Sequence, residues 1–294
     1  MKLGLHVTSF TWPNAPASIP ETLRSIARAA EDAGFYSLSV MDHFFQMEQM
    51  GGPAHPMLEA YSALAYLAAS TSRVKLGALV TGVIYRHPGA LIKSVSTLDV
   101  LSGGRAELGI GAGWYEREAR GLGLPFPPTK ERFERLEETL RIAHHMWSGQ
   151  AAPFEGRHYT LAEPTNNPQP ISKPHPPINI GGLGERKTLR FVAQYGDACN
   201  LFSFAGPDFV RAKLDVLRRH CDAVGRPYEQ VERTGLTAFD LRTTSADDAI
   251  GMLRGLSEAG LQRVDIVLPE VHDLRAIEII GSQIIPVVRE FGEA

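Results

Sequence analysis

The chain has 294 residues, of which 44% are hydrophobic, and carries a formal net charge of -3. This length allows one large domain with a full core, and the charge lacks the basic footprint of a nucleic-acid-binding protein. Two cysteines exclude a disulfide framework and favour a reducing compartment. No apolar run approaches the roughly 20 residues that span a membrane, and the start has no signal-peptide layout. We therefore expect a cytoplasmic protein without membrane or nucleic-acid partners.

Apolar strand-like runs alternate with amphipathic helical segments along the whole chain, a pattern typical of a parallel sheet with crossover helices. About eight such units, with no linker between them, predict a single domain over residues 1–294 with a TIM (β/α)8 barrel fold and insertion segments. A doubly wound open sheet is the alternative. Strands are expected near residues 2–8, 36–42, 74–81, 105–113, 177–182, 198–203, 233–243 and 263–269. Helices are expected near residues 19–33, 58–71, 88–101, 129–148, 184–195, 207–224, 246–259 and 273–290.

Three segments interrupt this repeat. Residues 44–57 and 114–128 follow the second and fourth strands, on the side where TIM barrels carry their chemistry. Residues 149–176 are rich in proline, and the run 154–161 within them predicts a small hairpin. We expect this third segment to cross toward the mouth of the barrel as a cover.

The most informative motif is the turn Gly182-Leu183-Gly184, which follows an apolar strand and precedes a helix. Glycines bring bare amides close to a ligand, and the unpaired N–H groups at a helix start suit a phosphate. An ordinary strand-to-helix turn would use the same residues. A second glycine-rich strand end, Gly109-x-Gly111-x-Gly113 before Trp114, falls at the same phase of the repeat. It lacks the spacing of the dinucleotide fingerprint, but side-chain-free backbone there suits the edge of a large aromatic ring.

Asp42-His43 closes the second expected strand, at the predicted mouth. Histidine suits proton transfer near neutral pH, and an adjacent acid can orient it; a loop histidine packed under residues 44–57 is the structural alternative. His6 is expected to line the pocket floor or to be a satisfied core histidine, while Phe10 and Trp12 follow as candidate substrate contacts. A metal site is not predicted, because no His-x-His or Glu-x-x-His spacing appears.

The third expected strand ends in Gly77-Ala78-Leu79-Val80-Thr81-Gly82 and is too long for one straight strand. Its small residues indicate a bulge where the backbone approaches something flat.

Four of these motifs together resemble the bacterial luciferase-like monooxygenase superfamily, most closely its branch of oxidoreductases dependent on coenzyme F420, a deazaflavin. They are Asp42-His43, the strand-3 bulge with Tyr85-Arg86-His87-Pro88, the run from Gly111 to Glu118, and the run from Pro177 to Gly184. The resemblance covers nearly the whole chain in the right order. It implies a TIM barrel, a homodimer, and coenzyme F420 or, alternatively, FMN bound at the mouth.

The resemblance also implies roles for individual residues. The turn at Gly182 to Gly184 would hold the cofactor phosphate, and His43 would lie over the reactive face of the ring. A non-proline cis peptide, matched here to Ala78–Leu79, would support that ring. The implied cofactor contacts are Asp42, Ala78, Leu79, Thr81, Gly111, Gly113, Trp114, Gly181, Gly182, Leu183 and Gly184.

One departure from the family pattern concerns the substrate. The sugar-phosphate dehydrogenase branch has a Glu directly after the Gly-x-Gly, where this chain has Trp114, so glucose 6-phosphate is not expected and the acid role is left with His43 alone. We expect hydride transfer between coenzyme F420 and a small, mostly apolar organic substrate. The alternatives are a two-component monooxygenase using reduced FMN, a non-catalytic cofactor carrier, and a metal-dependent hydrolase. A flavin or F420 reductase is a compatible partner.

Overall fold

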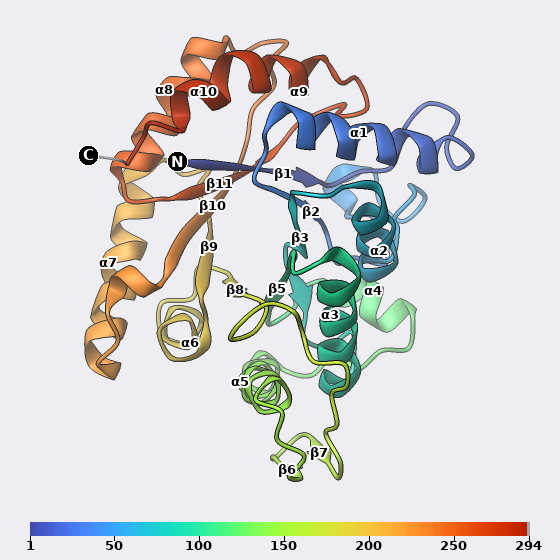
Figure 1. Cartoon of the computed structure of the whole chain (residues 1–294), viewed down its shortest axis with the longest axis vertical. Helices are drawn as coiled ribbons and strands as arrows, with labels where there is room; N and C mark the ends of the chain where they lie inside the picture. Colours follow the sequence, from blue (N-terminus) through green and yellow to red (C-terminus); the bar gives the residue numbers. More distant parts are fainter. Residues whose placement is uncertain (293–294) are drawn as a thin grey trace.

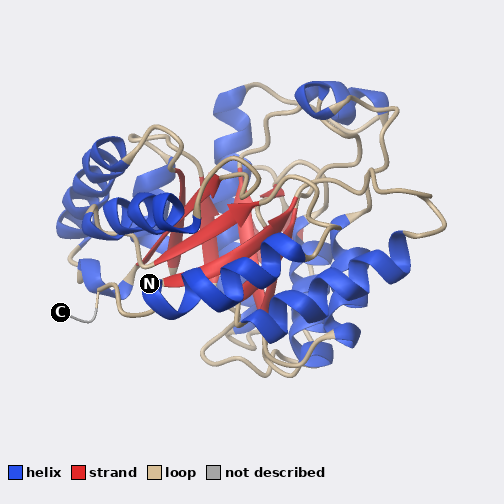
Figure 2. Cartoon of the chain, turned by 90° about the horizontal axis from the view of Figure 1, so that it is seen from above, coloured by secondary structure: helices blue, strands red, loops and turns tan. Residues whose placement is uncertain are grey.

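A closed barrel of parallel strands forms the centre of the molecule. The computed structural model describes residues 1–292. Strand β1 pairs with β2 on one side and with β11 on the other, and pairing of β3 with β5 closes the ring. Figure 1 shows the helices arranged around these strands, and Figure 2 shows the strands enclosed by them. This closure confirms the TIM barrel and rules out the open sheet.

The strands and helices follow the expected order. The barrel strands, with the short β4, are β1 (Lys2–Val7), β2 (Ser37–Val40), β3 (Lys75–Ala78), β4 (Thr81–Gly82), β5 (Ala106–Gly111), β8 (Ile178–Gly181), β9 (Ala198–Phe202), β10 (Glu232–Ala238) and β11 (Arg263–Val267). The larger helices are α1 (Ile19–Ala33), α2 (Ala60–Ser70), α3 (Pro88–Ser102), α5 (Thr129–Trp147), α6 (Thr188–Tyr195), α7 (Pro207–Val224) and α8 (Ala246–Glu258). Short elements are η1 (Glu48–Met50), α4 (Glu116–Gly121) and η2 (Tyr228–Gln230). Within residues 1–292, no helix is long and apolar enough to cross a membrane.

The last expected helix, 273–290, is divided into three parts. These are α9 (Arg275–Ile279), the π-helical turn η3 (Ile280–Ile284) and α10 (Ile285–Val288). Pro286 stands at the start of α10 and has no backbone N–H to donate. The hydrogen-bond pattern therefore widens to a π turn just before it.

An ion-paired cluster fills the floor of the barrel, at the N-terminal ends of the strands. Arg263 is almost fully buried and lies 2.8 Å from Glu107, 3.6 Å from Glu232 and 3.8 Å from Asp265. Asp265 also accepts a hydrogen bond from Ser37 at 3.0 Å. Burial raises the pKa of Asp265 to about 6, although the charge of Arg263 opposes this rise. These polar contacts fill the N-terminal end of the barrel, so we expect a ligand to enter from the C-terminal end.

The third strand is interrupted, as its length predicted, but the cis peptide lies one residue later than expected. The non-proline cis bond joins Leu79 to Val80, not Ala78 to Leu79. The amide of Leu79 still donates to Val40 at 2.9 Å. The chain therefore stays paired with β2 as far as this amide and changes direction only after it.

The proline-rich segment forms the expected hairpin, β6 (Phe154–Glu155) and β7 (Thr160–Leu161). The expectation that it covers the mouth is wrong, because none of residues 149–176 lines the large cavity there. The hairpin extends beyond α5 instead (Figure 1). Buried Glu138 on α5 fixes it there, since its carboxylate accepts hydrogen bonds from the amides of Arg157 at 2.7 Å and Tyr159 at 3.0 Å.

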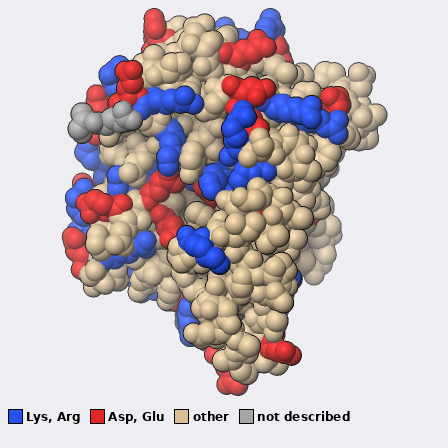
Figure 3. Space-filling view, in the orientation of Figure 1, with Lys and Arg blue, Asp and Glu red and all other residues tan. Residues whose placement is uncertain are grey.

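The charged surface is mixed. On the face that Figure 3 shows, basic and acidic side chains are interspersed and no broad area of one sign appears.

Candidate active site

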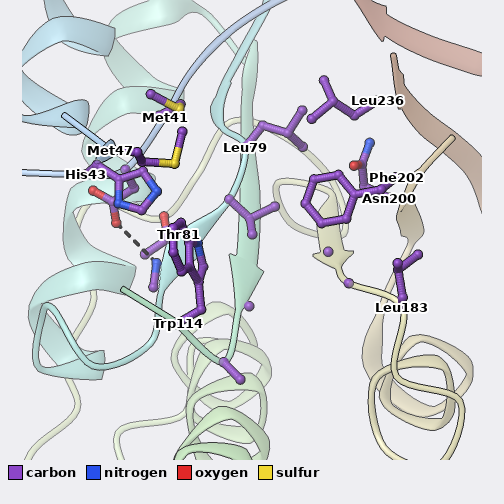
Figure 4. Close-up of a pocket in the computed structure, with 18 of the residues that line it drawn as sticks. Met41, His43, Met47, Leu79, Thr81, Trp114, Leu183, Asn200, Phe202 and Leu236 are labelled. Carbon is purple, nitrogen blue, oxygen red and sulfur yellow. Dashed lines mark hydrogen bonds between the residues drawn. The ribbon is translucent and has the colours of Figure 1, made fainter. Parts of the chain in front are cut away.

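A cavity of about 830 Å³ lies at the C-terminal ends of the barrel strands. Figure 4 shows His43, Met41 and Met47 on one side of it, and Leu183, Asn200 and Phe202 on the other. Most of the residues predicted from the sequence line this space. They are His6, Asp42, His43, Leu79, Thr81, Gly111, Gly113, Trp114, Gly181, Gly182, Leu183 and Gly184.

Three predicted contacts do not line the cavity. Ala78 faces a small space in the barrel floor instead. Phe10 is 1% and Trp12 is 6% exposed, and their rings pack edge to face at 5.5 Å. Both rings belong to the hydrophobic core, where their apolar area stabilises the fold. Neither is available to a substrate in this cavity.

His43 is held by a residue that the sequence did not single out. Its Nδ1 lies 2.6 Å from Oε1 of Glu118, which is fully buried. The other carboxylate oxygen of Glu118 accepts the amides of Phe44 at 2.7 Å and Phe45 at 3.1 Å. Tyr85 also donates its hydroxyl proton to Oε1. Because Nδ1 is engaged, Nε2 is the ring nitrogen left for a reacting molecule.

The protonation state of Glu118 follows from these contacts. Burial raises the pKa of this carboxyl, but the hydrogen bonds from His43, Tyr85 and the Phe45 amide together bring it below its usual value. Glu118 is therefore an anion that accepts the Nδ1 proton of His43. A neutral His43 then presents the Nε2 lone pair as a base, and a cationic His43 presents an Nε2 proton as an acid.

The helix α4 explains why Glu118 points inward. Glu116 and Arg120 lie four residues apart and form a 2.6 Å ion pair on the exposed side. Glu118, between them in sequence, falls on the opposite side of the helix. Nothing in the run Glu116-Arg117-Glu118 distinguishes these carboxylates unless a helix is recognised there.

Asp42 does not orient His43, although it precedes it in the chain. Its carboxylate forms a bidentate pair with Arg86 at 2.8 and 2.9 Å, and it accepts the amide of Gly82 at 3.3 Å. Burial raises the pKa of Asp42, with the Arg86 charge opposing the rise. Arg86 also contacts Glu59 at the start of α2. Asp42 thus ties the end of β2 to the loop before α3.

No group of three or more His, Cys, Asp or Glu side chains in residues 1–292 has the geometry of a metal site.

His6 is a neutral side chain at the cavity. Its Nδ1 lies 2.9 Å from the hydroxyl of Ser39, and the residue is 3% exposed. Burial lowers the pKa of His6 to about 4. At neutral pH it therefore offers hydrogen bonding without charge.

The glycine turn before α6 presents fewer free amides than expected. The Gly182 amide donates to the carbonyl oxygen of Asn200 at 3.1 Å, so it belongs to the barrel. Within residues 1–292 the amides of Leu183 and Gly184 have no hydrogen-bond partner. A Cβ on Gly184 would lie 2.7 Å from Oγ1 of Thr188, the first residue of α6. The groups of this turn that are free to accept an anion are therefore the Leu183 and Gly184 amides and the Thr188 hydroxyl. Of these residues, the sequence did not single out Thr188.

The other glycines make room for one side chain. A Cβ on Gly181 would lie 2.8 Å from Val80 Cγ1, and one on Gly111 would lie 3.1 Å from Val80 Cγ2. Val80 itself lines the cavity. These glycines therefore place an apolar platform in the cavity wall, beside Thr81, whose Oγ1 lies 2.8 Å from the Tyr61 hydroxyl.

The wall around His43 is mostly apolar. Met41, Met47 and Met50 line it together with Trp114, which is 56% exposed. Trp114 stacks on Tyr115 at 5.1 Å and meets the His43 ring edge-on at 5.5 Å. Unbranched thioethers adapt to ligands of different shape, so this end suits an apolar substrate.

The family model for luciferase-like monooxygenases matches residues 1–249. The chain belongs to this family.

Among its relatives, an F420-dependent glucose-6-phosphate dehydrogenase of Kineococcus radiotolerans is 34% identical over 221 residues. That match covers 73% of this chain and 62% of the relative, so the chain spans less than two thirds of that protein. An F420-dependent secondary alcohol dehydrogenase in complex with an F420-acetone adduct has a TM-score of 0.82 at 19% identity, covering 97% of this chain and 98% of the other. EDTA monooxygenase from Chelativorans sp. BNC1 has a TM-score of 0.84 at 15% identity, covering 99% and 94%. Both solved structures share the fold of this member of the luciferase-like family.

Proposed function

We propose that this protein is an oxidoreductase that transfers a hydride between coenzyme F420 and a small, mostly apolar organic substrate. The observation that carries the proposal is the His43–Glu118 pair at the edge of a cavity whose other side presents the free amides of Leu183 and Gly184. The F420-dependent relative supports a deazaflavin as the cofactor.

The residues present fit such a cofactor. Leu183, Gly184 and Thr188 would hold its phosphate, and the platform of Leu79 and Val80 would support its ring. When bound, the deazaflavin supplies or accepts the hydride at its C5 position. The task of the protein is to position, to exclude water and to move one proton.

His43 is the residue that would move this proton. Its Nε2 would donate a proton to the substrate during reduction, or remove one during oxidation. Glu118 would hold the ring in place and stabilise its cationic form. This arrangement gives the acid and base role to one histidine with a fixed orientation.

The lining of the cavity favours a neutral substrate over a sugar phosphate. Met41, Met47 and Trp114 surround His43, and no Lys or Arg of residues 1–292 lines that wall. A phosphorylated sugar would bury its charge there without a partner, which is costly.

Binding and turnover test this proposal. Purified protein is titrated with F420 and, separately, with FMN while cofactor fluorescence is followed. Oxidation of reduced F420 is then measured with a panel of apolar enones and ketones. We expect binding of F420 and turnover that falls about 100-fold or more in His43→Asn, with the dissociation constant of F420 unchanged. Binding of FMN alone would indicate the reduced-FMN monooxygenase, and full turnover in the variant would remove His43 from the mechanism.

We further propose a cytoplasmic homodimer whose cofactor is reduced by a separate F420 reductase. Size-exclusion chromatography with light scattering tests the dimer, and a monomeric mass would contradict it.

A further inference from the structure

Arg132 contributes a positive charge to the cavity. It is the one Lys or Arg among the cavity-lining residues of the described chain, 1–292. It lies in the first turn of α5 with Thr129, and Phe133 follows directly; both of these neighbours also line the cavity. The Phe133 ring lies 6.3 Å from that of Phe191 on α6, so this part of α5 packs against α6, which follows the glycine turn.

Within residues 1–292, no carboxylate pairs with the charge of Arg132. Its guanidinium donates to the Pro127 carbonyl at 2.8 Å and lies 3.2 Å from Thr129 Oγ1, and it covers the Phe126 ring at 4.3 Å. Its Nε is buried and has no hydrogen-bond partner among the described residues. A guanidinium in a cavity is stabilised strongly by an anion, because charge-assisted hydrogen bonds are about twice as strong as neutral ones.

Lys187 adds a second such charge where α5 packs against the segment before α6. Its Nζ lies 5.1 Å above the Phe133 ring, and it has no carboxylate partner within residues 1–292. Neighbouring lysines differ: Lys213 pairs with Glu185 at 2.6 Å, and Lys130 lies 3.9 Å from Glu134. Arg132 and Lys187, which flank Phe133 at the edge of the cavity, therefore both lack a carboxylate partner within residues 1–292.

We propose that this seam, formed by Arg132, Phe133 and Lys187, is a subsite for a carboxylate-rich tail that continues from the cofactor phosphate. The inference rests on the proposed function. A phosphate is already served by the amides of Leu183 and Gly184 and by the Thr188 hydroxyl. Two further cations match additional negative charge. F420 carries that charge on glutamyl residues beyond its phosphate, whereas FMN ends at the phosphate.

The seam therefore distinguishes F420 from FMN by the negative charge beyond the phosphate and not by the ring system. It would bind F420 with a long glutamyl tail more tightly than F420 with a short one, and would add little to the binding of FMN. Its contribution would weaken with salt, because the seam lies at the solvent edge of the cavity.

Fluorescence titration tests this subsite. The probes are F420 with long and short glutamyl tails and the deazaflavin riboside that lacks phosphate and tail. The variants are Arg132→Gln, Lys187→Gln and their double variant. Lys130→Gln, on the exposed side of α5, is the control whose charge change equals that of either single variant. We expect the double variant to bind long-tailed F420 about tenfold more weakly. It should bind the riboside as the original chain does, and Lys130→Gln should bind all probes normally.

Three results would overturn the inference. The first is that the original chain binds F420 with the same dissociation constant whatever its tail length. The second is that the double variant loses the same affinity for short-tailed and long-tailed F420. The third is that Lys130→Gln loses as much affinity for long-tailed F420 as the double variant does. Failure of the proposed function looks different, because then neither the riboside nor any F420 binds. Thermal melting of each variant confirms that it is folded before titration.

Discussion

His43 and Glu118 are joined by a 2.6 Å hydrogen bond although 75 residues separate them in the chain. The loop after β2 and the short helix α4 meet at this contact. Three further donors, the amides of Phe44 and Phe45 and the hydroxyl of Tyr85, fix the same carboxylate. We therefore expect Glu118 to act through His43 as a positioning residue, so that its removal changes the chemistry more than the binding of the cofactor.

Glu118→Gln keeps the shape of the side chain but removes its charge. We expect kcat to fall about tenfold to 100-fold, because cationic His43 loses its carboxylate partner. The dissociation constant of F420 should stay unchanged. The pH profile of kcat should also move to lower pH, which a merely structural role would not cause.

Glu116→Gln is the matched control for that variant. Glu116 lies on the same helix but pairs with Arg120 in solvent, so its loss should leave kcat and the pH profile unchanged. If Glu118→Gln lowered the melting temperature but left the pH profile in place, Glu118 would be structural.

Gly184→Ala tests the proposed phosphate site at the glycine turn before α6. The added Cβ would lie 2.7 Å from Thr188 Oγ1, so the threonine must turn away or the loop must shift. We expect F420 to bind about tenfold more weakly, since one hydrogen bond to a charged group contributes about 1.5–3 kcal/mol. Titration with the deazaflavin riboside, which has no phosphate, should show no loss. Equal losses for both molecules would place the phosphate elsewhere.

The fold could be predicted because its signals are local. Strand runs and amphipathic helices repeat along the chain, and Gly34 and Ser245 mark helix ends through a positive φ of 90° and a side-chain cap. Placement of the β6–β7 hairpin could not be predicted in this way. It depends on Glu138, a buried acid on α5 that reads as part of a solvated helix surface.

The site was predictable only in part, for the same reason. The residues at strand ends, such as His43 and Gly184, reach the cavity because the barrel places all strand ends together. Glu118 and Thr188 enter the candidate site through contacts that the local sequence pattern does not contain. Phe10 follows β1 toward the mouth, yet its ring is buried in the core because apolar area outweighs position in the chain.

Two glycine-to-alanine changes should affect stability in opposite directions. A Cβ on Gly109 would lie 2.0 Å from the carbonyl oxygen of Ala78, which is backbone and cannot turn away. We expect Gly109→Ala to lower the free energy of unfolding by about 3 kcal/mol or more. Gly251, within α8, has no atom of residues 1–292 within 4 Å of its Cβ position. Its change to Ala should add about 0.5–1 kcal/mol to the free energy of unfolding. Chemical denaturation measures both, and a stable Gly109→Ala would mean that β3 and β5 can separate.

His6 should make stability depend on pH in a defined window. Its pKa is lowered by burial from 6.5 to about 4, so between these values the unfolded chain binds a proton that the folded chain does not. The contribution of His6 to the free energy of unfolding is therefore full above pH 6.5. It is lost as the pH falls toward 4, by about 3 kcal/mol in total.

Asp265 has the opposite effect on the free energy of unfolding, because folding raises its pKa from 3.8 to about 6 and the folded chain holds the proton. In the original chain, the changes that His6 and Asp265 cause in the free energy of unfolding between pH 4 and 6 therefore offset each other. His6→Gln removes one of them, so its free energy of unfolding should fall as the pH rises from 4 to 6, relative to the original chain. Denaturation curves at several pH values measure this difference, and parallel curves would mean that His6 is not buried in its neutral form.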